Sequence, residues 1–174
     1  MNVSNNARRK TSVARIEKAY LELLQENKRE EITVREIAKR AGINRSTFYA
    51  NYTDISELEE KIKERLLSEF RAIYKEEVRK RSGSNDFLKL FYHIKDNQML
   101  YRAYFRLGSG FSAEDIRYDP VQAEKYFKNK YIDYHIEFFY NGLNAVIKKW
   151  LEKGCAETPE EIEFIIKSEY AGRK

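Results

Sequence analysis

Residues 33–52 read TVREIAKRAGINRSTFYANY, and this stretch decides the fold of the N-terminal region. It begins with a Thr that is followed three residues later by a Glu, which is the capping-box pattern at the start of a helix. Gly42 comes about two turns later and suits the left-handed conformation that ends helices. Asn44 can cap the next helix. The stretch therefore predicts two short helices joined by a tight turn.

Apolar periodicity predicts longer helices on both sides of this stretch. Hydrophobic side chains recur every three or four residues, which is the spacing of one helix face. The predicted helices cover about residues 11–27, 54–80 and 99–107. Another helix begins near Phe87, one runs from Phe127 to Trp150 and ends at Gly154, and the last runs from Thr158 to Tyr170. Seven glycines and two prolines give too few turns for a β-sandwich or barrel. We therefore expect an all-α fold, with a loop over residues 108–120.

Charged and aromatic residues divide the chain into two regions. Residues 1–53 contain 11 Lys and Arg against 6 Asp and Glu, so they hold the whole net charge of +5. The rest is neutral and contains 20 of the 24 aromatic residues. This pattern predicts a three-helix helix-turn-helix domain over residues 1–53, joined by a long helix to a larger helical bundle over residues 54–174. A basic module on a neutral body indicates an anionic partner at one end of the molecule.

The second short helix has a face suited to reading DNA. Phe48 and Tyr52 are four residues apart and are predicted to face the core, so that Arg45, Ser46 and Tyr49 share the opposite face. An arginine in the first turn can bind a guanine through two hydrogen bonds, and hydroxyl groups suit phosphates. The second helix of a helix-turn-helix enters the major groove. A three-helix bundle whose basic face is merely solvated is the alternative interpretation.

Two further features of the N-terminal region bear on an anionic partner. Thr33 lies at a helix N-terminus, where the free amides favour anions. Arg8, Arg9 and Lys10 form a basic run that we expect to be flexible. This run is equally compatible with a DNA-contacting arm and with a solvated tail.

The motif from Ile37 to Tyr52, with Thr33 before it and Leu58 after it, resembles the DNA-binding signature of TetR/AcrR-type repressors. The resemblance covers roughly residues 13–58. It implies an all-helical homodimeric transcription factor that binds double-stranded DNA at a palindromic operator, with a variable C-terminal domain for ligand and dimer. The DNA-binding residues that we expect from this resemblance and from the helix face are Thr33, Arg45, Ser46, Thr47, Tyr49 and Asn51.

The sequence departs from the family pattern at two positions. The family usually has His at the position of Asn51 and a phosphate-binding Lys at the position of Ile55. The resemblance therefore does not establish the contact with the DNA backbone that this Lys makes in the family. Downstream, the Asp54-Ile55 pair and residues 139–143, 150–151 and 158–161 resemble a Gram-positive subgroup similar to regulators of dihydroxyacetone kinase operons. Members of that subgroup do not share one effector, so this resemblance implies no ligand.

The last two predicted helices carry more apolar surface than one small domain buries, which predicts a dimer interface. The expected interface residues are Phe139, Gly142, Leu143, Val146, Trp150, Ile162, Ile165 and Ile166. Four tyrosines are candidates for a ligand pocket, although core tyrosines with satisfied hydroxyls are commoner. They are Tyr92, Tyr101, Tyr104 and Tyr134.

Nothing in the sequence has the pattern of an enzyme. There is no glycine-rich phosphate loop and no nucleophile elbow. His93 and His135 lie far apart and Cys155 is the single cysteine, so we expect no catalytic residue, no metal site and no cofactor. No stretch has the pattern of a signal peptide or a membrane span, so we expect a cytoplasmic, nucleoid-associated protein without membrane contacts.

The predicted function is that of a sequence-specific DNA-binding transcriptional regulator. The specific form that we expect is a homodimeric repressor released by a small-molecule effector or a co-regulator protein. The alternative is a helical adaptor whose N-terminal helices bind another protein.

Overall fold

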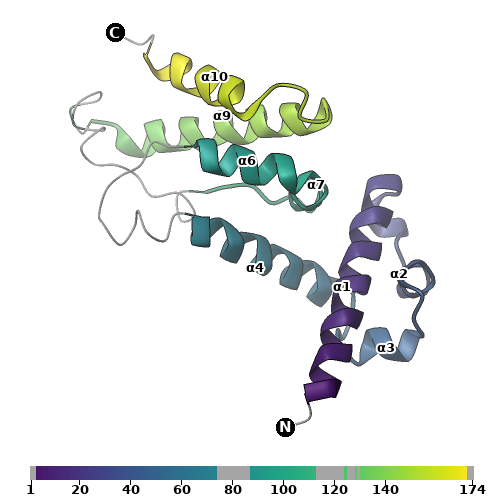
Figure 1. The fold of residues 1–174 in the computed structure, drawn as a ribbon. Helices are drawn as coiled ribbons and strands as arrows, with labels where there is room; N and C mark the ends of the chain where they lie inside the picture. The colour runs from purple at the N-terminus through teal and green to yellow at the C-terminus, as the bar shows by residue number, and fades with distance from the viewer. Residues whose placement is uncertain (1–2, 74–86, 113–123, 125–127, 129, 172–174) are drawn as a thin grey trace.

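The regular structure of the described residues is helical (Figure 1). A computed structural model describes residues 3–73, 87–112, 124, 128 and 130–171. Its helices are α1 (Val3–Glu26), the 3-10 helix η1 (Arg29–Glu31), α2 (Val34–Ala41), α3 (Arg45–Tyr49), α4 (Ile55–Ile73), α6 (Leu88–Asp96), α7 (Gln98–Arg106), α9 (Ile132–Glu152) and α10 (Pro159–Ala171). No strand occurs within these ranges, and the predicted all-α fold is confirmed.

The two short helices of the predicted helix-turn-helix are α2 and α3. Thr33 and Glu36 form the expected capping box at the start of α2, and Gly42 ends that helix in the left-handed conformation with a φ of 64°. Asn44 precedes α3 but its side chain forms no capping hydrogen bond, contrary to expectation. The Thr47 amide donates instead to the Asn44 backbone carbonyl at 2.9 Å, because the first turn of this short helix is tight.

The first helix, α1, is longer than the apolar pattern predicts. It begins at Val3 rather than near Thr11, and residues 6–10 are helical and exposed. The basic run 8–10 is therefore part of a helix, and the expectation of a flexible segment was wrong. The apolar stripe starts near Val13, so it does not mark the residues before it. Alanine, arginine and lysine are good helix formers, and they extend the helix toward Val3 although they do not pack against the core.

The long helix α4 joins the two halves of the chain, as predicted. Asp54 caps its first turn, where the Asp54 carboxylate accepts a hydrogen bond from the Glu57 amide at 2.8 Å. The inner face is fully buried at Leu58, Ile62, Leu66 and Phe70. The predicted continuation of this helix over residues 74–80 lies outside the described residues.

The C-terminal bundle consists of α6, α7, α9 and α10 (Figure 1). α9 and α10 run in opposite directions, and α6 packs against α10. Gly154 follows the end of α9 with a φ of 72°, and Thr158 forms the predicted capping box with Glu161. α9 begins at Ile132, and the predicted start at Phe127 lies outside the described residues, as does the part of the expected loop over residues 113–120.

The two halves share one hydrophobic core. Buried side chains form a continuous cluster from Ile16 in α1 to Ile166 in α10. α7 packs against α1 as well as against α4 and α9, and the Arg106 guanidinium of α7 donates a hydrogen bond to the carbonyl of Leu24 near the end of α1. Two connections therefore join the halves, α4 through the chain and α7 through packing. The domain boundary at residue 53 stays a prediction.

Candidate nucleic-acid interface

The helix α3, the second of the helix-turn-helix, turns a polar face to solvent. Phe48 and Tyr52 are buried, which agrees with their spacing in the sequence. Arg45, Ser46 and Tyr49 are exposed on the other side. The Tyr49 ring packs edge to face on Phe48, with 5.6 Å between ring centroids, and 51% of the Tyr49 side chain remains exposed. The helix thus presents one guanidinium and two hydroxyl groups from a supported position.

Thr33 is exposed but already engaged in its capping box. Its hydroxyl and its amide both donate to Glu36 Oε2, at 2.8 and 2.9 Å. These hydrogen bonds hold the pKa of Glu36 below its usual range, because they favour the ionised carboxylate. A phosphate can accept a hydrogen bond from the Thr33 hydroxyl only if the Glu36 carboxylate turns away. Thr33 as a DNA contact stays a prediction with that condition.

Thr47 and Asn51 are half-buried and contact each other. The Asn51 side-chain amide donates to the Thr47 carbonyl at 2.7 Å, which satisfies a carbonyl at the end of α3. Asn51 Oδ1 is buried and has no hydrogen-bond partner in the described part of the chain. The sequence did not reveal this capping role, because the spacing of four residues also fits a side chain turned outward. Contacts of Thr47 and Asn51 with DNA stay predictions.

A buried carboxylate ties this region to α4. Glu59 is 6% exposed. The Arg29 guanidinium donates to both of its oxygens at 2.9 Å, and the Tyr20 hydroxyl of α1 donates to Oε1. We call Tyr20, Arg29 and Glu59 the joint cluster. Its paired hydrogen bonds fix the direction of α4 against α1 and η1.

Sequence reasoning missed the joint cluster, although a signal was present. Glu59 lies four residues after Ile55 and seven before Leu66, so it stands on the apolar stripe of α4. A carboxylate at a buried position requires partners, because an unpaired buried charge is costly. The same reasoning does not identify Arg29 as the partner, since 30 residues separate the two in the chain.

A second group of polar contacts holds Tyr52, which follows α3, against the neighbouring helices. The Tyr52 hydroxyl donates to Glu17 of α1 at 3.3 Å, and Arg65 of α4 pairs with the other Glu17 oxygen at 2.8 Å. Tyr52, Glu17 and Arg65 therefore connect the residues after α3 to both neighbouring helices. The position of α3 is determined by apolar packing on one side and by these hydrogen bonds at its end.

The joint cluster predicts a stability change at alkaline pH. Burial, followed by the hydrogen bond to Glu59, raises the pKa of Tyr20 far above its ordinary value of 10.0. The folded chain therefore keeps a proton that the unfolded chain loses. We expect the contribution of Tyr20 to the free energy of unfolding to be complete below about pH 10 and to fall by about 1.4 kcal/mol per pH unit above it.

Urea denaturation of wild type and Tyr20→Phe between about pH 8 and 11 measures this contribution. The difference between the two free energies should be constant below about pH 10 and should shrink above it. A difference that stays constant over the whole range contradicts the described burial of the Tyr20 hydroxyl.

The four candidate pocket tyrosines have unlike surroundings. Tyr101 and Tyr104 are buried, both rings pack on Phe111, and both hydroxyls are hydrogen-bonded within the chain. Tyr92 and Tyr134 are exposed. The structure brings the first two together and leaves the other two at the surface. A ligand pocket lined by these residues stays a prediction.

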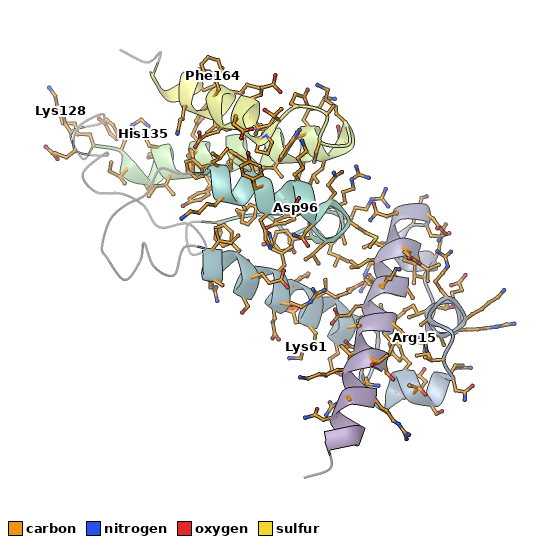
Figure 2. All side chains as sticks on the ribbon, in the orientation of Figure 1. Arg15, Lys61, Asp96, Lys128, His135 and Phe164 are labelled. Atoms are coloured by element: carbon orange, nitrogen blue, oxygen red, sulfur yellow. The ribbon has the colours of Figure 1, made fainter. Side chains whose placement is uncertain are left out.

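The expected interface residues of α9 and α10 fall into two groups. The first is buried in the core of the chain itself and comprises Leu143, Trp150, Ile162 and Ile166. The second is partly or fully exposed and comprises Phe139, Gly142, Val146 and Ile165. Phe164, 71% exposed, lies on the outer side of α10 (Figure 2). Only the second group and its exposed neighbours are accessible to a partner chain, because the first group is buried within the chain. The sequence prediction mixed the two groups, because an apolar pattern does not show which face the chain itself covers.

None of the helices in the described ranges is long and apolar enough to cross a bilayer.

Two family models match the chain. Residues 10–62 match the model of bacterial regulatory proteins of the tetR family, and this match runs from Lys10 within α1 to the first turns of α4. Residues 84–168 match the model of the transcriptional regulator C-terminal region of TetR type, which covers α6 to most of α10. No curated protein matches the chain. The two matches cover the helix-turn-helix and the bundle that follows it, and the chain therefore belongs to the tetR family of bacterial transcriptional regulators.

Proposed function

We propose that this regulator is a sequence-specific repressor that inserts α3 into the major groove of a palindromic operator. The observation that carries the proposal is the exposed face formed by Arg45, Ser46 and Tyr49 on a helix whose other side is buried. The charge of residues 1–53 supplies attraction to phosphates. Thr33, Thr47 and Asn51 complete the proposed contacts. Such a protein acts in the cytoplasm, at the nucleoid.

Arg45 is expected to read one base pair in each half-site. Its side chain is exposed in the first turn of α3, and no carboxylate of the described residues pairs with it. Arg45→Ala should weaken binding to the preferred operator by about 1–3 kcal/mol and relax the preference at that base pair. Tyr49→Phe is the matched comparison, because a lost phosphate contact weakens all sequences alike. Binding of operator variants by fluorescence anisotropy measures both effects, and an unchanged base preference in Arg45→Ala contradicts the assignment.

We also propose that the exposed side of α9 and α10 forms the homodimer interface. Gly142 is exposed, and a Cβ placed there would have no atom within 4 Å, so a side chain at this position leaves the fold of the chain intact. Gly142→Arg should therefore give folded monomers, while Gly142→Ala should remain dimeric. Ile165→Asp, at a position 41% exposed on α10, should also dissociate. Sedimentation velocity at micromolar concentration measures the mass, and an unmutated monomer would refute the interface.

Release from DNA by a small-molecule effector or a co-regulator protein is a further part of the proposal. An effector changes operator affinity only if it binds two arrangements of the protein with different affinities. The packing of α7 on α1 supports such coupling, because a shift of α7 moves the helix that holds α2. The resemblance to regulators of dihydroxyacetone kinase operons stays a prediction, and neither family model supports it.

The experiment that tests the function is a genome-wide binding map of the tagged protein, followed by anisotropy with a duplex from an enriched site. A regulator should give enriched palindromic sites, and log affinity should fall linearly with log salt by about 0.9 for each phosphate contact. No enriched sites, together with capture of a protein whose binding resists salt, would favour the adaptor.

A further inference from the structure

The first half of α1 is a basic helical surface that the contacts of α3 do not use. Residues 1–16 contain four cations, Arg8, Arg9, Lys10 and Arg15, and no acidic residue. All four side chains are exposed. No ion pair involves any of them within the described part of the chain. The cations also lie at the N-terminal end of the helix, where the macrodipole is positive. Their charge destabilises this end of the helix unless an anion lies near it.

The acidic residues of α1 are in the opposite situation. Glu17 pairs with Arg65 of α4 at 2.8 Å. Glu22 and Glu26 pair with Arg40 of α2 at 3.7 and 2.6 Å. The negative charge of this helix is therefore neutralised within the protein, whereas the positive charge of its first half is left for a partner.

The spacing of the charges shows which side of α1 they occupy. Arg8, Arg15 and Glu22 are each seven residues apart, so they share one face of the helix. Glu22 places that face on the side of α2, because it pairs with Arg40. Arg8 and Arg15 thus continue the helix-turn-helix side of α1 toward its N-terminus. We call these two residues the arginine stripe.

The arginine stripe lies level with α3 along the axis of α1. Tyr52, which follows α3, bonds to Glu17 of α1, and this bond places the end of α3 at the height of Arg15, although Glu17 itself projects toward Arg65 of α4. Figure 1 shows α3 beside the N-terminal half of α1, and the first turns of α1 continue beyond it. Arg15 lies on this part of α1 in Figure 2. A duplex read by α3 therefore runs close to the stripe.

We infer that the arginine stripe binds the DNA backbone beside the groove that α3 enters, as a fixed helical surface rather than as a flexible arm. Seven residues of helix rise about 10 Å, and a duplex carries on the order of six phosphates over that length. Two guanidinium groups at this separation can therefore each bind one phosphate. The inference rests on the proposed DNA-binding function and adds a second, sequence-independent contact to it.

The test compares two pairs of substitutions that remove equal charge from the same helix. Arg8→Gln with Arg15→Gln removes the stripe. Arg9→Gln with Lys10→Gln is the control, because both residues are exposed and line the groove that faces Arg65 of α4, on a different face of α1. Both pairs should leave helix content and melting temperature unchanged, since all four side chains are exposed.

The probe is a mixed-sequence duplex of about 30 base pairs, with binding measured by anisotropy between about 50 and 200 mM salt, because phosphate contacts do not depend on sequence. The stripe pair should lower the log–log salt slope by about 1.8 for each chain bound and weaken binding at the lowest salt by about tenfold or more. The control pair should change the slope by less than half as much. Equal effects of the two pairs, or an unchanged slope in the stripe pair, would overturn the inference. If the wild-type protein still binds DNA in that case, the proposed DNA-binding function remains supported.

Insertion of one alanine between Lys10 and Thr11 separates a helical surface from a flexible arm. The insertion turns Arg8 by about 100° away from the stripe without changing the charge. The salt slope should then fall by about 0.9, as for the loss of one phosphate contact. A slope that is insensitive to the insertion shows that the segment acts as an arm and overturns the helical surface.

Discussion

Trp150→Ala is expected to lower the free energy of unfolding by about 3–5 kcal/mol, the usual cost of removing a large aromatic side chain from a core. Trp150 is 1% exposed and packs edge to face on Phe91, with 6.0 Å between ring centroids. Its indole N–H donates to the Glu157 carbonyl at 3.1 Å. The side chain thereby joins α6, α9 and the turn before α10. Urea denaturation followed by circular dichroism measures the loss.

Glu152→Ala is the control on the same helix, because Glu152 is 68% exposed and its ion pair with Lys149 lies at the surface. We expect its effect to stay within about 0.5 kcal/mol. Protein concentration is held equal in all samples, because the stability of a dimer depends on it. A loss below about 1 kcal/mol in Trp150→Ala is incompatible with the described packing.

Glu59→Ala is expected to lower the free energy of unfolding by about 2–3 kcal/mol. The change leaves the hydroxyl of the fully buried Tyr20 without its acceptor. It also removes the partner of Arg29, but that side chain is 45% exposed, so water replaces part of the lost interaction. Glu59→Gln should cost less, because the amide oxygen can still accept a hydrogen bond from the Tyr20 hydroxyl.

Glu64→Ala is the matched control for this prediction. Glu64 is also on α4 and pairs with Lys61 at 2.8 Å, but both side chains are more than half exposed. We expect a change within about 0.5 kcal/mol, as for other surface ion pairs. Equal losses in Glu59→Ala and Glu64→Ala would show that the joint cluster contributes no more than a surface pair.

Much of the fold was predictable because its signals are local. The capping boxes at Thr33 and Thr158 and the left-handed glycines at Gly42 and Gly154 depend on neighbouring residues alone, and all four formed as predicted. The start of α1 was predicted too late, because the apolar stripe marks the part of a helix that packs and says nothing of turns that extend beyond the core.

The exposed face of α3 was also predictable, since helical spacing separates Phe48 and Tyr52 from Arg45 and Tyr49. The hydrogen bonds around that face were not. Thr33 donates to Glu36, and Asn51 donates to the Thr47 carbonyl, so both side chains have partners within the protein. Sequence spacing allows such bonds but does not choose between them and an outward rotamer.

By itself the sequence determined the helical class, the helix-turn-helix and the basic end of the molecule, because periodicity, capping and charge are properties of residues close together in the chain. Only the tertiary structure decided that Glu59 meets Arg29 and Tyr20, that α7 packs on α1, and which apolar residues of α9 and α10 are buried. These contacts join residues 30 to 82 positions apart, as in the pairs Arg29–Glu59 and Leu24–Arg106. They arise from the packing of whole helices, so local patterns cannot specify them.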